Sequence, residues 1–209
     1  MKASRRRVVI ASFFLGALVV AWPSEVASAA GPFLLTGSMS TSREYHRATA
    51  LADGTVLVTG GIDMVRCLTS AEIYHPETGT FSVTVGEMAT PRYDHAATLL
   101  RDGTVLITGG SAGGSVAGIT AKAEIYHPAT GTFSATVGDM TTPRYIHRAT
   151  LLRDGTVLIT GGYNGSELAS AEIYDPTTST FSAVGAMSTS RNEHTATLLA
   201  DGTVLITGG

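Results

Sequence analysis

The sequence predicts an all-β chain built from four copies of one unit. The stretch Asp-Gly-Thr-Val-Leu-Ile-Thr-Gly-Gly occurs at 53–61 (with Val58 in place of Ile), 102–110, 154–162 and 201–209. The copies start 49, 52 and 47 residues apart. A period near fifty residues is typical of a propeller or solenoid unit, and four strands per unit are the usual content. No helical pattern follows the first 29 residues, so each unit is expected to consist of strands and turns.

The second unit shows how the strands are predicted. Ala96–Leu100 is expected to be the first strand, and Asp102-Gly103 then makes a tight hairpin, because glycine tolerates the positive φ that such turns need. The run Thr104–Thr108 is apolar and β-branched on both faces, as a strand buried between neighbouring units requires. Pro128 ends the third strand, because proline cannot donate to a ladder. The third and fourth strands are expected at Ala123–Tyr126 and Phe133–Val137.

Three features recur at the same phase in every unit, and we interpret them as structural. They are an arginine, a histidine three residues after it, and the double glycine that ends the second strand. A residue copied into every unit serves the packing or hydrogen bonding of that unit more often than one asymmetric site. The set is Arg43, Arg92, Arg144, Arg191, His46, His95, His147, His194, Gly60, Gly61, Gly109, Gly110, Gly161, Gly162, Gly208 and Gly209.

Over residues 33–209 the chain resembles the kelch family. The features that carry the resemblance are Gly60-Gly61 after an apolar strand, the later Tyr74, the aromatic Phe81 that opens the fourth strand, and Arg92 before the next unit. The same set follows in the later copies, with Phe where the family more often has Trp. The resemblance implies an all-β, kelch-type β-propeller of four-stranded antiparallel blades, with strand one innermost around a central channel.

The units divide residues 30–209 into an incomplete propeller segment. The blades are expected at about 40–82, 89–134 and 141–182, with a partial blade at 188–209. Residues 33–39 align with Phe181–Met187, so they are interpreted as an orphan fourth strand. Three blades, a leading strand and half a blade do not close a ring of four or more blades. We therefore expect the remaining blades to come from a longer chain, with self-association as the alternative.

Residues 1–29 are predicted to be a signal peptide. Lys2 and Arg5–Arg7 form a basic segment, Val8–Trp22 forms an apolar one, and Ala27-Ser28-Ala29 offers small residues for cleavage. The apolar run is about fifteen residues, shorter than the roughly twenty that a membrane helix needs. The protein is therefore expected to be secreted, extracellular or periplasmic, with no membrane span after the signal is removed.

Charge and cysteine content exclude several functions. Without residues 1–29 the chain has 10 basic and 16 acidic residues, which argues against a nucleic-acid partner, because phosphate binding favours a basic face. Cys67 is the only cysteine, so no intrachain disulfide is possible. The histidines follow none of the common metal-binding spacings. No metal or other cofactor is expected.

The residues that differ between the otherwise similar units mark the candidate binding positions. If strand one is innermost, the residues that flank each repeated histidine gather at one mouth of the channel, each from a different blade. Acidic, basic and aromatic groups on such a concave surface can form a ligand site, although ordinary variation of exposed loops is the alternative. The candidates are Tyr45, Arg47, Tyr93, Asp94, Tyr145, Arg148 and Glu193.

The loops between strands two and three also vary in length and content. Recognition residues often lie on such loops of a rigid scaffold, although they can equally serve only to connect strands. The segment Gly109–Gly118 is Gly-rich, but no helix or Lys-Ser/Thr follows it, so we interpret it as a flexible linker and not a phosphate loop. The corresponding loops are Ile62–Ser70 and Tyr163–Ser170.

Two functions are compatible with these observations. The favoured one is an exported, non-catalytic module that binds a protein or glycan, either alone or as an adhesion or surface-layer domain. The alternative is the N-terminal part of a copper-radical oxidase of carbohydrates or alcohols, because Arg43-Glu-Tyr45-His before Asp53-Gly resembles galactose oxidase-type propellers. That resemblance implies copper as cofactor and Tyr45 as a ligand. Those oxidases also have a cysteine shortly before an Asp-Gly turn, and no copy here has one.

Overall fold

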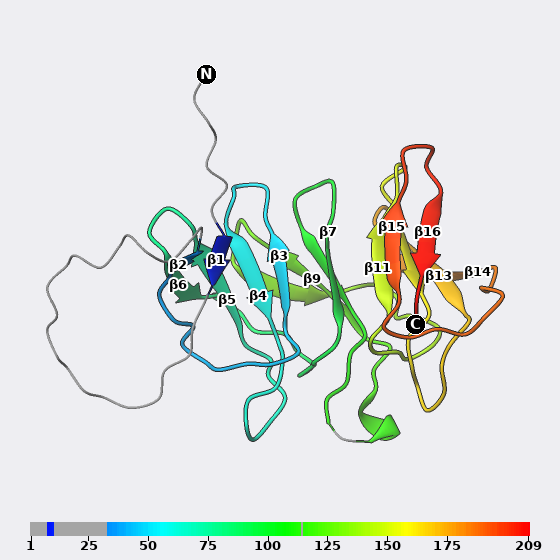
Figure 1. Ribbon diagram of the computed structural model, residues 1–209, viewed down its shortest axis with the longest axis horizontal. Coiled ribbons are helices and arrows are strands. Elements are labelled where there is room, and N and C mark those ends of the chain that lie inside the picture. The colour runs from blue at the N-terminus through cyan, green and yellow to red at the C-terminus, as the bar shows by residue number, and fades with distance from the viewer. Residues whose placement is uncertain (1–7, 11–32, 114) are drawn as a thin grey trace, which may run out of the picture.

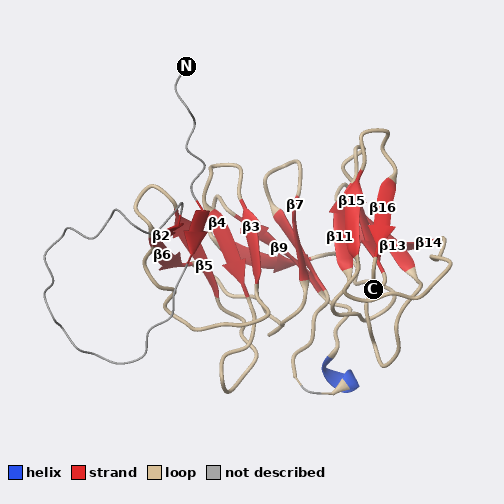
Figure 2. Ribbon diagram, in the orientation of Figure 1, coloured by secondary structure: helices blue, strands red, loops and turns tan. Residues whose placement is uncertain are grey.

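The computed structural model describes residues 8–10, 33–113 and 115–209. From residue 47 onward its strands form a row of antiparallel sheets (Figures 1 and 2). Of the predicted signal peptide, only β1 (Val8–Ile10) lies within the described residues. One helical element is present in the described part, the 3₁₀ turn η1 (Val116–Gly118), where no helix was expected. No helix in this part is long and apolar enough to span a membrane.

Three sheets have four strands each, and their strand order follows the chain. Blade one contains β3 (Arg47–Ala50), β4 (Val56–Thr59), β5 (Ala71–His75) and β6 (Thr80–Val83). Blade two contains β7 (Ala96–Leu99), β8 (Val105–Thr108), β9 (Ala123–His127) and β10 (Thr132–Ala135). Blade three contains β11 (Arg148–Leu151), β12 (Val157–Thr160), β13 (Ala171–Asp175) and β14 (Thr180–Val184). Unit four contributes β15 (Thr195–Leu198) and β16 (Val204–Thr207).

The arrangement of these sheets confirms the predicted fold class. The strands of blade two lie within two residues of their expected ends. The first strands of successive units are neighbours, β3 beside β7, β7 beside β11, and β11 beside β15 (Figure 1). Strand one of each unit is therefore the inner strand, as expected for propeller blades, and the blades follow one another along the chain.

The second strand of each blade explains why the units pack. All four residues of β8 are buried. Leu106 packs between blades two and three with residues such as Val157, whereas Val105 and Ile107 pack between blades one and two with residues such as Leu57. Because side chains alternate across a strand, one apolar strand fills two cores. The hydrophobic core therefore lies between blades and not within any single one.

The leading strand differs from the expected residues 33–39. β2 covers only Phe33–Leu35, and its strand neighbour within the described residues is β1, in parallel, so pairing with later strands is not found there. The segment after β2 nevertheless contacts blade one in the way that the segment after a fourth strand contacts the next blade. The N–H of Gly37 donates to the carbonyl of Gly79 at 2.7 Å, as Gly86 donates to Gly131 at 2.9 Å in the next blade.

The Asp-Gly hairpins depend on a left-handed glycine. Gly103 has φ of +85°, and a Cβ there would meet nothing within 4 Å. Gly103→Ala is therefore expected to lower the free energy of unfolding by about 1–2 kcal/mol, from backbone strain without a clash. Gly103→Asn is expected to cost less, because asparagine tolerates this region. Urea unfolding of both variants checks this, and equal losses would contradict it.

Candidate functional site

The predicted site residues lie at one end of the blades. The first residue of each inner strand pairs with the last residue of the second strand, for example Ala96 with Thr108. The residues before strand one and the loops after strand two therefore share one rim, which we call the loop rim. It contains residues 44–46, 93–95, 145–147 and 192–194 together with the loop residues 62–70, 111–113, 115–122 and 163–170 (Figure 1).

A left-handed residue recurs at the loop rim of every unit. Tyr45, Asp94, Ile146 and Glu193 have φ of 54°, 49°, 49° and 50°. Residues other than glycine rarely adopt this conformation, least of all a β-branched one such as Ile146. Their backbones are tied together, because Asp94 N–H donates to the Tyr45 carbonyl (3.0 Å), Ile146 to Asp94 (2.9 Å) and Glu193 to Ile146 (3.2 Å). These hydrogen bonds fix the same backbone conformation at this position in every unit. Only the side chain differs from one unit to the next.

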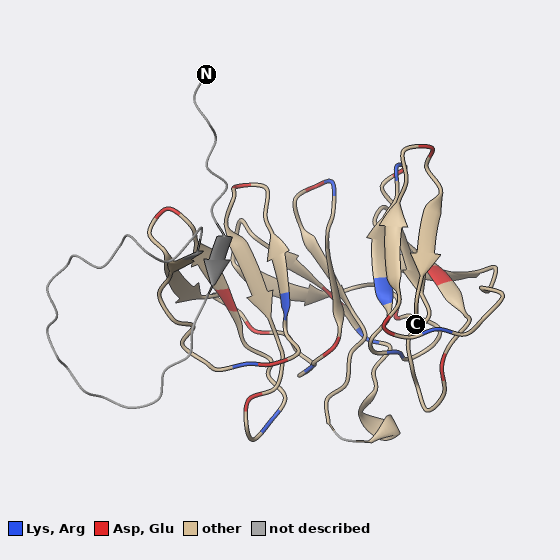
Figure 3. Cartoon of the chain, viewed as in Figure 1, with Lys and Arg blue, Asp and Glu red and all other residues tan. Residues whose placement is uncertain are grey.

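Charged candidates lie beside this line of hydrogen bonds. Arg47 and Arg148 are the first residues of β3 and β11, where basic segments appear in Figure 3. Their Nε groups donate to the carbonyls of His95 (2.6 Å) and His194 (2.5 Å) in the following units. Nη2 of Arg47 also lies 3.6 Å from Oδ1 of Asp94. These two arginines therefore join blade one to blade two and blade three to unit four.

Electrostatics link four of the candidate residues. Burial raises the pKa of Asp94, and Glu193 raises it further, while Arg47 and Arg148 act in the opposite direction. Burial likewise lowers the pKa of Arg47, and Asp94 opposes this shift. The structure thus brings Arg47, Arg148 and Glu193 within electrostatic range of Asp94, although the four residues come from four different units.

The tyrosines of the loop rim form a row. Ring centroids are 6.1 Å apart for Tyr45 and Tyr93, 6.3 Å for Tyr93 and Tyr145, and 5.8 Å for Tyr145 and Tyr163. Tyr45 is 57% exposed, and the other three are partly exposed. Tyr163 was not among the predicted candidates. It occupies the position after the double glycine, where the other blades have Ile62 and Ser111, and its backbone pairs with Tyr145.

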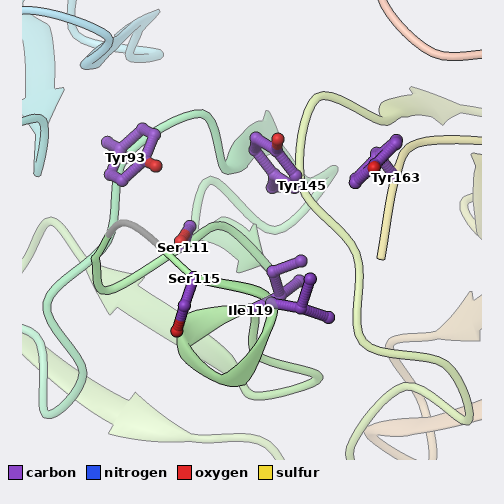
Figure 4. A pocket seen from close by; sticks show the side chains of 7 residues that line it. Tyr93, Ser111, Ser115, Ile119, Tyr145 and Tyr163 are labelled. Atoms are coloured by element: carbon purple, nitrogen blue, oxygen red, sulfur yellow. The ribbon is translucent and has the colours of Figure 1, made fainter. Parts of the chain in front are cut away.

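A pocket of about 250 Å³ opens beside three of these rings. Figure 4 shows Tyr93, Tyr145 and Tyr163 along one side, with Ser111, Ser115 and Ile119 on the other. The segment predicted to be a flexible linker supplies this second wall, because it holds the η1 turn and a bridge from Ser111 to Ile119. The described part of that loop is therefore structured.

The double glycines permit close contact between blades. A Cβ on Gly109 would lie 2.3 Å from the carbonyl oxygen of Arg144 in the next blade, and Gly109 has φ of +59°. The second glycine, Gly110, donates its N–H to that same carbonyl at 2.9 Å. Equivalent short approaches exist at Gly60 and Gly161. A side chain at this position would push neighbouring blades apart.

The repeated histidines lie in the junctions between blades. Nε2 of His95, His147 and His194 is 2.8–2.9 Å from the hydroxyl of Thr59, Thr108 and Thr160, the last residue of the second strand in the preceding blade. All three imidazoles are buried. Burial lowers the pKa of each, and nearby arginines lower it further, so the neutral form is favoured. His46 is partly buried and contacts the carbonyl of Arg43 instead.

The repeated arginines bind inside their own blade. Nη2 of Arg92 donates to Glu124 Oε1 at 2.6 Å, and Nη1 donates to the carbonyls of Gly109 (2.8 Å) and Lys122 (2.9 Å). The Arg43–Glu72 and Arg144–Glu172 pairs repeat this contact at 2.8 and 2.7 Å. Sequence reasoning did not single out these glutamates, although they too are copied in each Ala-Glu-Ile-Tyr strand.

The oxidase alternative implies a copper site that includes Tyr45. Within the described residues, no three His, Cys, Asp or Glu side chains come close enough to share a metal ion. Tyr45, the implied copper ligand, faces the ring of Tyr93. Cys67 is a free thiol in the loop after strand two, and burial and Asp63 raise its pKa.

Comparison with known proteins agrees with the geometry. The family model of the kelch motif matches residues 45–84 and 147–188, which correspond to blades one and three. No curated protein matches the chain. Blade two has the same strand order and the same buried Arg–Glu pair as the two matched blades. The motif matches in two blades and the repeated four-stranded architecture support a kelch-repeat family for this chain.

Proposed function

We propose that this kelch-repeat chain is an exported, non-catalytic module that binds a protein ligand on its loop rim. Kelch repeats imply a propeller-type protein-interaction module. The observation that carries the proposal is the row of Tyr45, Tyr93, Tyr145 and Tyr163, spaced 5.8–6.3 Å apart on a hydrogen-bonded frame. Export is supported by the basic, apolar and small-residue segments of residues 1–29.

Tyrosine suits this role for physical reasons. Its ring provides a large contact area with few rotatable bonds, so little entropy is lost on binding, and its hydroxyl can hydrogen-bond at the wet edge of an interface. Tyrosine is accordingly enriched among residues that dominate binding energy. The backbones of Tyr93 and Tyr145 are paired with Ser111 and Tyr163, so the rings are held before any ligand arrives.

The test is a selection of displayed peptides on the wild-type chain, followed by affinity measurements on a Tyr93→Ala/Tyr145→Ala variant. Selected peptides are expected to bind the variant at least about tenfold more weakly, because two central rings are lost. Glu77→Ala is the control, since Glu77 is exposed in the turn after strand three, at the opposite end of the blade. Peptides that bind the variant and wild type equally would contradict the proposal.

Two further assays address the alternatives. If a glycan array, and not the peptide selection, yields ligands that depend on Tyr93 and Tyr145, the rim is the site but a glycan is the ligand. Copper-dependent release of hydrogen peroxide from a sugar alcohol or aldehyde would overturn the non-catalytic assignment.

A further inference from the structure

Three tyrosine rings form adjoining walls of one pocket at the loop rim. The rings of Tyr93 and Tyr145 are inclined at 74°, and those of Tyr145 and Tyr163 at 87°, so successive rings are close to perpendicular. All three line the pocket of about 250 Å³ (Figure 4). We call this set the tyrosine box. The three rings therefore stand in different planes around one small volume.

Backbone contacts hold the tyrosine box in place. Tyr93 and Ser111 exchange two N–H···O=C bonds of 3.0 Å, and Tyr145 and Tyr163 exchange two of 3.2 and 3.0 Å. Val116, on the opposite wall, lies close to the blade-three loop, because a Cβ built on Gly165 would be 3.5 Å from it. The pocket therefore lies between two adjacent blades, on backbone that is hydrogen-bonded at each ring.

The electrostatic character of the box favours a cation. The face of an aromatic ring carries negative potential, and a cation within about 6 Å of a ring centroid is attracted to it. The side chains that line the pocket include tyrosine, serine, valine and isoleucine, with no lysine or arginine among them. Burial raises the pKa of Tyr145, and Tyr93, Tyr163 and the carboxylates of Asp94 and Glu193 raise it further.

The nearby arginines are engaged elsewhere. Arg47 lies against Asp94 and donates to the carbonyl of His95, and Arg148 donates to the carbonyl of His194. Neither arginine lines the pocket. Glu193 is exposed and has no ion-pair partner within 4.0 Å among the described residues. A carboxylate therefore remains for a positively charged ligand near the box.

We propose that the tyrosine box binds a cationic head group, namely the ammonium or guanidinium of a lysine or arginine side chain on the protein ligand. The volume suits one side-chain end and not a folded surface, so the box anchors a single residue while the rest of the ligand follows the tyrosine row. The inference rests on the proposed function of the loop rim and names the chemistry that one part of it recognises.

The test is an NMR titration of the chain with ¹³C-labelled tyrosine rings. The sequence has seven tyrosines, and single Tyr→Phe variants assign their signals. The probes are blocked Gly-Lys-Gly and Gly-Arg-Gly peptides, blocked Gly-Glu-Gly, choline, and 3,3-dimethyl-1-butanol, which has the shape of choline without its charge. Signals of Tyr93, Tyr145 and Tyr163 are expected to shift with the cations, while those of Tyr74, Tyr126 and Tyr174, which pack on the fourth strands, stay unchanged.

The comparison of probes decides the outcome. Choline is expected to bind roughly 2- to 30-fold more tightly than its neutral analogue, the range that a cation–π contribution gives. Tyr145→Ala is expected to abolish the shifts, whereas Tyr145→Phe retains them, because the ring face and not the hydroxyl carries the interaction. Tighter binding of the lysine or arginine peptide than of choline supports a protein side chain as the source, and the reverse indicates a small quaternary ammonium.

Equal binding of choline and its neutral analogue would overturn the cation assignment. If Gly-Glu-Gly alone shifts the box tyrosines, the loop rim still binds peptides but the proposed charge is wrong. If peptides selected on the loop rim bind while no cationic probe moves any box signal, the box is not the anchor. Absence of both effects would reject the proposed function as well.

Discussion

Replacing Arg92 by alanine is expected to lower the free energy of unfolding by about 3–5 kcal/mol, as for other broken buried ion pairs. Arg92 is fully buried, and its partner Glu124 is 3% exposed. Removal of the guanidinium would leave a buried carboxylate whose remaining donors are the N–H groups of Ala89 and Thr90. It would also leave the carbonyls of Gly109 and Lys122 without their bonds to Arg92. Urea unfolding measures the loss.

Arg191 provides a matched control within the same chain. It stands at the same position in its unit, but it is partly exposed, and its guanidinium donates from Nη1 to the Gly208 carbonyl at 2.7 Å. Arg191→Ala is therefore expected to cost about 1 kcal/mol, the usual net value of one hydrogen bond. An Arg92→Met/Glu124→Leu double variant should lose less than the single variant Arg92→Ala, because no charge is left buried alone. Equal losses for Arg92→Ala and Arg191→Ala would contradict this account.

The same arginines show what the sequence can predict and why. Four in-phase copies of one apolar strand between turn signals predict four-stranded blades, and the structure confirms that fold class, because a strand such as β8 buries both faces against neighbouring blades. Comparison of equivalent positions in the repeats also separates the residues that every unit needs from the residues that vary. It does not reveal the partners, since the acceptor of Arg92 lies 32 residues further along the chain, on β9.

The candidate site was harder to predict. The sequence does show where three of the tyrosines lie within their units. Each of Tyr45, Tyr93 and Tyr145 comes just before the repeated histidine. Tyr163 lies in a loop of variable length, and only the fold brings it to Tyr145. The left-handed backbone at Ile146 has no local signal either, because intrinsic preference at such a position favours glycine or asparagine. Contacts between blades impose this conformation against local preference.

The buried histidines are expected to make the fold acid-sensitive. The pKa of His95 lies well below its ordinary value of 6.5. Burial is the main cause, followed by Arg92 and then by Arg47, His147 and His46. Burial also dominates at His147, where Arg144, Arg47, Arg148 and His194 act in the same direction. The unfolded chain takes up protons below pH 6.5 that the folded chain does not, so stability falls as the pH drops through that value. Each histidine that stays neutral costs about 1.4 kcal/mol per pH unit.

Two such histidines predict a loss of about 3 kcal/mol for each pH unit below 6.5, and His194, whose pKa is lowered mainly by burial, adds to it. Because a domain is stable by only roughly 5–15 kcal/mol, a loss of this size would unfold a domain at the low end of that range about two pH units below 6.5. Urea unfolding from pH 7 to pH 5 measures the slope, and His147→Gln should reduce it by about 1.4 kcal/mol per pH unit. The Thr108–His147 bond crosses the junction between blades two and three, so protonation of His147 would weaken the contact between these blades. An unchanged slope in His147→Gln, or folded imidazoles that titrate near 6.5, would contradict this.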